Sequence, residues 1–108
     1  MAASETATQL LADVRNYLDI TWADAAGDQK LLGIIDRGIA YVNRIAGRAQ
    51  DYSASGAALG LLLNYCRYER ANAFEDFAVN YRAELLALQL DEGVAMFGAV
   101  QTGDAGEL

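Results

Sequence analysis

The sequence predicts an all-α fold: a small bundle of three to four helices with a long central helix and a short extended C-terminal tail. Two observations point to helices. Apolar residues recur every three or four positions in three segments, and the 108 residues include no proline to interrupt them. The length suits one domain, so we expect a single helical domain over residues 1–108, with an ordered core at about residues 6–100 and a flexible C-terminal tail.

The first predicted helix covers residues 6–19, where leucine, valine and tyrosine fall at helical spacing. Residues 24–28 carry a glycine among acidic residues, which predicts a turn, and Asp28 is placed to cap the helix that follows. That helix, residues 29–46, has the clearest apolar stripe in the chain. Gly47 stands where a helix C-cap belongs.

The long central helix is predicted over residues 57–90, because this stretch holds no proline and no glycine after Gly60. Apolar residues lie on two sides of its first half. We therefore expect the two earlier helices to pack around it and, in an assembly, a neighbouring subunit as well. The pattern allows a break near residues 79–81. Residues 94–100 are a short apolar run that we interpret as either a strand or an irregular packed tail.

The charge and apolar content favour a protein that binds other proteins. Fifteen acidic residues against eight basic ones give a formal net charge of −7, which repels nucleic acid. Apolar residues make up 54% of the chain, more than one small core readily hides, so self-association is expected. The alternative is a monomer in which alanines inflate the apolar fraction.

The residue types that most catalytic and metal sites need are scarce. The chain contains no histidine, the commonest general base, and its one cysteine, Cys66, falls in an apolar stripe, where we expect a buried, inert thiol. The sequence also lacks the signatures of structural zinc, di-iron and phosphate-loop sites. We therefore expect no enzyme activity, no cofactor and no metal. The single cysteine, with no apolar leader or membrane span, indicates a reducing, cytoplasmic setting.

Charged and aromatic residues on the second and third predicted helices form a candidate subunit interface. Basic residues in 29–46 are spaced by seven, with another four residues later, and so follow one side of that helix. Tyrosines, which are enriched at interfaces, and acidic residues lie along the long helix. The candidates are Lys30, Arg37, Arg44, Arg48, Tyr65, Tyr68, Glu69, Glu75 and Asp76. The alternatives are a solvated charged face and ordinary core packing of the tyrosines.

Two parts of the sequence resemble the head-tail connector proteins of tailed phages, also called head-completion or adaptor proteins. One is VRNYLDIT at residues 14–21, followed by an acidic turn, the apolar positions of residues 31–42, and Gly47. The other is LLLNYCRYERANA at residues 61–73. The resemblance consists of apolar positions and turns, and together these parts span most of residues 10–90.

The resemblance implies a structural protein of the virion. Members of this family form a ring of about a dozen copies beneath the portal protein, which extends the channel for DNA. For this chain it implies four partners or neighbours: copies of itself, the portal, a tail-side or stopper protein, and DNA that passes without specific binding. It also implies no membrane partner and assembly in the bacterial host cytoplasm, from a phage or a prophage. The basic row and the acidic residues would supply complementary faces.

A second hypothesis, from a different class, is a monomeric acidic helical binding protein. Such a protein would act as an inhibitor or DNA mimic on a basic partner. Tight capture of a nucleic-acid-binding enzyme by the monomer, lost when Glu69, Glu75 and Asp76 are neutralised, would favour this hypothesis over a connector.

Overall fold

The computed structural model is all-helical over the part of the chain that it describes, namely the backbone of residues 5–22 and 24–103 and the side chains up to residue 94. Within that part the helices are α1 (Glu5–Tyr17), α2 (Ala25–Ala46), α3 (Ala57–Arg70), α4 (Phe74–Asn80) and α5 (Arg82–Gly103). The all-α prediction is confirmed, although these five helices exceed the three to four expected. The flexible tail was expected after residue 100, but α5 continues to Gly103, and residues 104–108 lie outside the described residues.

α2 begins earlier than predicted, at Ala25, and Asp24 rather than Asp28 is its N-cap. The Asp24 carboxylate accepts a hydrogen bond from the backbone N–H of Ala26 at 3.2 Å. Gly27 lies in the first turn, where a Cβ would stand 2.8 Å from the Asp24 carboxylate. The glycine therefore makes room for the cap and does not form the turn that we expected.

The C-terminal end of α2 is at the position that the sequence predicted. Gly47 is the C-cap, and its φ of 86° is a left-handed conformation that glycine adopts without strain. Its backbone N–H donates to the carbonyls of Asn43 and Arg44, which would otherwise be unpaired at the end of the helix.

The helix predicted over residues 57–90 is broken twice. Asn72 takes the left-handed conformation, with φ of 57°, and the N–H groups of Asn72 and Ala73 donate to carbonyls in the last turn of α3. These two bonds end the helix in the way that a C-terminal glycine commonly does, and asparagine is the other residue that tolerates this conformation. The second break, at Tyr81, falls within the predicted 79–81.

α2, and not the stretch from residue 57, is the central helix of the described structure. It packs against α1, α3 and α5, and its apolar stripe is buried. α3 approaches it most closely at Gly38, where a Cβ would lie 2.6 Å from Leu62 Cδ1 and 2.8 Å from Tyr65 Cδ1. Only a residue without a side chain fits between these two helices at that point.

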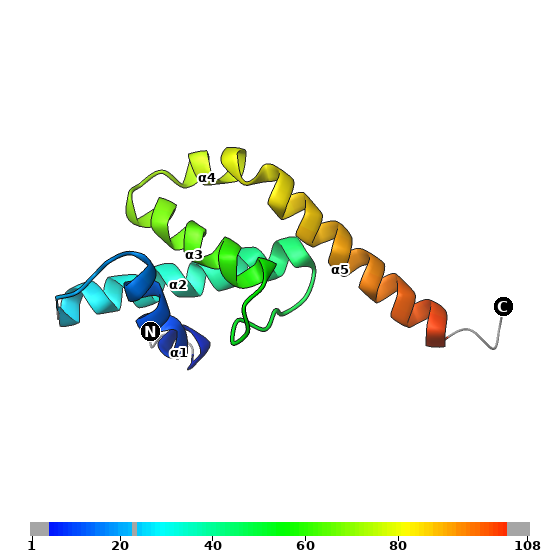
Figure 1. The fold of residues 1–108 in the computed structure, drawn as a ribbon, viewed down its shortest axis with the longest axis horizontal. Coiled ribbons are helices and arrows are strands. Elements are labelled where there is room, and N and C mark those ends of the chain that lie inside the picture. Colours follow the sequence, from blue (N-terminus) through cyan, green and yellow to red (C-terminus); the bar gives the residue numbers. More distant parts are fainter. Residues whose placement is uncertain (1–4, 23, 104–108) are drawn as a thin grey trace.

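α5 crosses the C-terminal end of α2 and then projects away from the bundle (Figure 1). The molecule is consequently elongated, measuring 58 × 29 × 24 Å. Residues 94–100, expected as a strand or an irregular tail, belong to this helix. Two alanines and a methionine in the run favour helix, whereas its two valines and one phenylalanine favour a strand, so the composition of the run alone does not decide between them.

Candidate subunit interface

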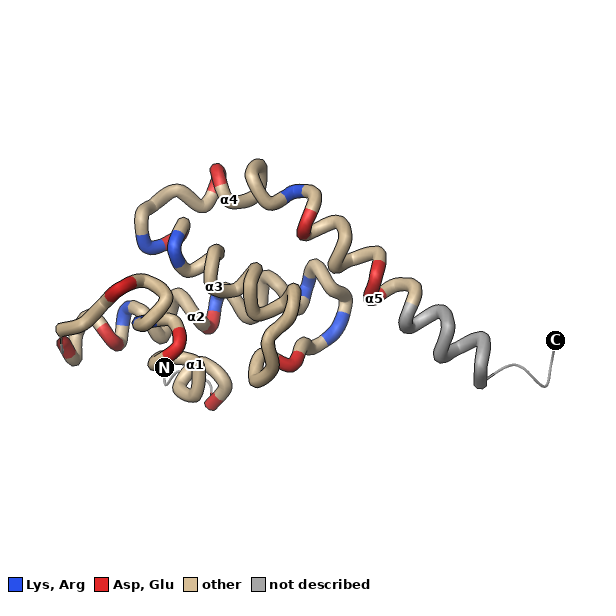
Figure 2. Tube along the Cα trace, viewed as in Figure 1, with Lys and Arg blue, Asp and Glu red and all other residues tan. Residues whose placement is uncertain are grey.

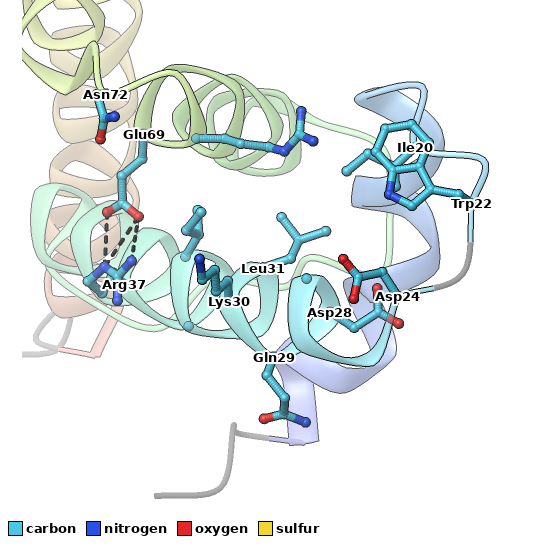
Figure 3. Close-up of a pocket in the computed structure, with 14 residues that line it drawn as sticks. Ile20, Trp22, Asp24, Asp28, Gln29, Lys30, Leu31, Arg37, Glu69 and Asn72 are labelled. Carbon is cyan, nitrogen blue, oxygen red and sulfur yellow. Dashed lines mark hydrogen bonds and ion pairs between the residues drawn. The ribbon is translucent and has the colours of Figure 1, made fainter.

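Arg37 and Glu69, which we predicted on contacting faces of neighbouring subunits, pair with each other within one chain (Figure 3). Arg37 donates from Nε to Oε1 of Glu69 at 3.0 Å and from Nη2 to Oε2 at 2.7 Å. The Tyr65 hydroxyl, one turn earlier on α3, donates to the same Oε1 at 2.6 Å. This network ties α2 to the C-terminal end of α3. A subunit contact here would therefore meet a neutralised pair and not two separate charges.

Burial and hydrogen bonding act in opposite directions on the pKa of the Glu69 carboxyl. Partial burial raises it, whereas the hydrogen bonds from Arg37 and Tyr65 and the charge of Arg37 lower it, and the net pKa lies below its ordinary value. A depressed folded-state pKa means that the pair stabilises the fold above the ordinary glutamate pKa of about 4.3. That contribution is lost as the pH falls through the folded-state pKa.

Replacing Glu69 with glutamine should lower the free energy of unfolding by about 0.5–1 kcal/mol at pH 7, and by progressively less below about pH 4. Urea unfolding across this pH range measures the effect. Glu75→Gln is the matched control, because Glu75 is exposed and belongs to no ion pair among the described residues. Equal losses in the two variants, or a Glu69→Gln loss that persists unchanged at low pH, would contradict this account of the network.

The other basic candidates differ in their surroundings. Arg48, just after α2, pairs with Glu92 of α5, so it joins the projecting helix to the bundle. The Arg44 guanidinium lies 5.6 Å from the ring centre of Tyr41 on its own helix. Lys30 is exposed and belongs to no ion pair among the residues that the structure describes. Positions of both charge signs occur along α2, α3 and α5 (Figure 2).

The two candidate tyrosines lie in an aromatic cluster that joins α2, α3 and α4. Tyr65 is buried, so core packing explains its position, as the alternative interpretation held. Tyr68 is half-buried, with its ring centre 5.8 Å from that of Phe77 and 4.9 Å from the guanidinium of Arg67. The full cluster comprises Tyr41, Tyr65, Tyr68, Phe74, Phe77 and Tyr81.

The remaining acidic candidates gather at one place. Glu75 and Asp76 occupy the first turn of α4, where negative charge suits the helix dipole, and both are exposed. Together with Glu69 they line a shallow hollow of about 430 Å³. The structure therefore brings the three predicted acidic residues together, although Arg37 already neutralises one of them.

One apolar surface of α5 was not among our candidates. Leu86, Leu90 and Val94 follow each other at every fourth position, so they lie along one face of the helix, and they are 52%, 58% and 70% exposed. Leu85 and Leu88, on the other side, are buried against the bundle. We call the exposed residues Leu86, Leu90 and Val94 the α5 stripe. Their i, i+4, i+8 spacing was visible in the sequence. When a helix has two apolar faces, however, the sequence does not show which face packs against the core.

A cleft of about 740 Å³ lies between α2 and the end of α3 (Figure 3). Ile20 and Trp22, from the connection between α1 and α2, stand at one end of it, and the Arg37–Glu69 pair stands at the other. Leu31 and Ile34 of α2 add apolar surface. We call this the α2–α3 cleft. Trp22 is 55% exposed, which is unusual for so large an apolar side chain.

Cys66 is buried, as predicted, and burial raises the pKa of its thiol to about 12. The group is therefore a protonated thiol at neutral pH. Among the described residues, no three histidine, cysteine, aspartate or glutamate side chains are placed to hold a metal ion. No helix in the same part of the chain has both the length and the apolar character needed to cross a membrane.

Comparison with known protein families, curated proteins and solved structures gives no match for this chain. Its interaction surfaces must therefore be interpreted from their own geometry.

Proposed function

We propose that this protein is a structural subunit of a phage or prophage head-tail connector. In this role copies of the chain form a ring that docks under the portal protein, faces a tail-side or stopper protein, and extends the DNA channel in the virion. The proposal rests on the resemblance of residues 14–21 and 61–73 to connector proteins and on one feature of the structure, the uncovered apolar face of α5.

The α5 stripe carries the proposal because a single chain leaves it in water. α5 is apolar on two sides, and the bundle covers only the side with Leu85 and Leu88. Covering Leu86, Leu90 and Val94 would gain roughly 1–2 kcal/mol each, since full burial of such a side chain is worth about 1.5–3 kcal/mol. Exposed apolar patches on soluble proteins commonly take part in contacts with other molecules.

The net charge of −7 suits a channel that DNA crosses without sticking. Phosphate binding depends on clustered cations, and an acidic wall repels the duplex instead. The same acidity underlies the alternative of a monomeric inhibitor or DNA mimic. We favour the connector because Glu69, one of the three acids on which that alternative depends, is paired with Arg37.

Electron microscopy of the full chain, alone and mixed with its portal protein, tests the proposed function. We expect ring-shaped particles with a central channel in at least one of the two conditions. Native mass measurement of the same samples gives the copy number. A chain that stays monomeric in both conditions would contradict the connector role. Capture of a basic enzyme by such a monomer, lost in a variant with Glu75→Gln and Asp76→Asn, would instead identify the inhibitor.

A further inference from the structure

Building on the proposed ring, we propose that α5 of one copy seats its α5 stripe in the α2–α3 cleft of the next copy. The occupant of the cleft is thus a second copy of this chain, bound through residues 82–94. The contact joins two different surfaces, so each copy offers one and receives the other. Head-to-tail contacts of this kind close into a ring when the rotation between neighbours permits.

The positions of the two surfaces require that the contact lie between copies. α5 meets the bundle at the C-terminal end of α2, where Glu92 pairs with Arg48, and then leads away from it (Figure 1). The α2–α3 cleft lies at the other end of α2, beside Trp22 and Lys30 (Figure 3). A helix that points away from its own cleft cannot fill it, but it can reach the cleft of a neighbour.

The apolar groups of the two surfaces fit each other. The α5 stripe offers two leucines and a valine in a row about 12 Å long, at 1.5 Å of rise per residue. The cleft offers Ile20, Leu31, Ile34 and the exposed ring of Trp22, in a volume of about 740 Å³ that accommodates several side chains. The stripe and the ring of Trp22 are exposed in the single chain, whereas Leu31 is buried and Ile20 and Ile34 are half-buried, so docking would chiefly remove the stripe and Trp22 from water.

The charges beside these surfaces are complementary. Asp91 lies three positions before Val94 of the stripe, Glu84 lies seven positions earlier on the same side of α5, and neither belongs to an ion pair among the described residues. Lys30 and Arg70 line the cleft and are likewise in no ion pair within that part of the chain. Three acids line it too, of which Asp28 and Glu69 are paired with Arg15 and Arg37, and Asp24 caps α2. Docking places two acids near two bases. Pairing α5 with a second α5 would bring like charges together, because no lysine or arginine follows Arg82.

Two full-length variants test the pairing. Leu90→Glu puts a charge in the stripe, and Trp22→Glu puts one in the cleft, facing the acidic helix. Both positions are exposed, so both chains should keep the helical content and thermal stability of the parent. We expect each change to weaken self-association roughly tenfold or more in sedimentation velocity. Val79→Glu, at a 74% exposed position on α4 outside both surfaces, is the matched control and should assemble normally.

Mixing the two variants gives the decisive result. The Leu90→Glu chain keeps an intact cleft and the Trp22→Glu chain keeps an intact stripe, so the mixture should form a 1:1 heterodimer that grows no further. If the Trp22→Glu chain assembles like the parent, or the mixture gives no heterodimer, the docking proposal is wrong while the ring survives. If the parent chain never assembles, with or without the portal protein, both the proposed ring and the docking proposal are wrong.

Discussion

Replacing Phe77 with alanine should lower the free energy of unfolding by about 3–5 kcal/mol. Phe77 is fully buried, and its ring centre lies 5.7 Å from that of Tyr65 and 5.1 Å from that of Tyr81. The side chain thus holds the short α4 against α3 and against the start of α5. Small domains are stable by only about 5–15 kcal/mol, so this one change removes a large share of the total.

Chemical denaturation followed by circular dichroism measures the Phe77 effect. Phe74→Ala is the matched control, because it removes the same ring from the same helix at a position that is 37% exposed. We expect it to cost about 1–2 kcal/mol, since less apolar surface is buried there. If the two variants lose equal stability, α4 is not anchored through Phe77 as described.

Replacing Gly38 with alanine should lower the free energy of unfolding by about 1–3 kcal/mol, even though alanine is the better helix former by about 1 kcal/mol. The added Cβ would stand 2.6 Å from Leu62 Cδ1 and 2.8 Å from Tyr65 Cδ1. Neither side chain can move aside cheaply, because Leu62 is fully buried and Tyr65 is held by its hydrogen bond to Glu69. The distance between α2 and α3 at Gly38 would have to increase.

Gly60→Ala provides the control for the Gly38 substitution. Gly60 also lies inside a helix, but a Cβ built there meets no atom within 4 Å. The same change should therefore stabilise the protein by up to about 1 kcal/mol, through helix propensity alone. Thermal unfolding of the two variants should shift in opposite directions. A stabilised Gly38→Ala chain would mean that α2 and α3 do not pack as closely as described.

The sequence was sufficient for the helical class and for the elements with strong local signals. The stripe of residues 29–46 and the Gly47 cap both depend on nearby residues, and both are present in the structure. The break near residues 79–81 was anticipated, but the break at Asn72 was missed, because asparagine is only one of several residues that can take a left-handed conformation. The start of α2 was misplaced because Gly27 resembles a turn residue, while in the structure it clears space for the Asp24 cap.

The candidate site could be predicted only in part, because residue spacing shows which residues share a helix face but not which residues of other helices they contact. Lys30, Arg37 and Arg44 are spaced by seven residues in the sequence, and all three lie on α2 as predicted. It could not show that Arg37 meets Glu69 of the same chain, since that contact depends on how α2 and α3 cross at Gly38. The α5 stripe was missed for the opposite reason, because both faces of α5 are apolar and only packing decides which stays exposed.

The most direct test of the central claim, that another copy of the chain covers the α5 stripe, is native mass spectrometry of the parent chain beside its Leu90→Glu variant. Both samples are measured at the same series of concentrations, with and without the portal protein. We predict a defined multimer for the parent and predominantly monomer for the variant. Identical distributions for the two chains would contradict the claim.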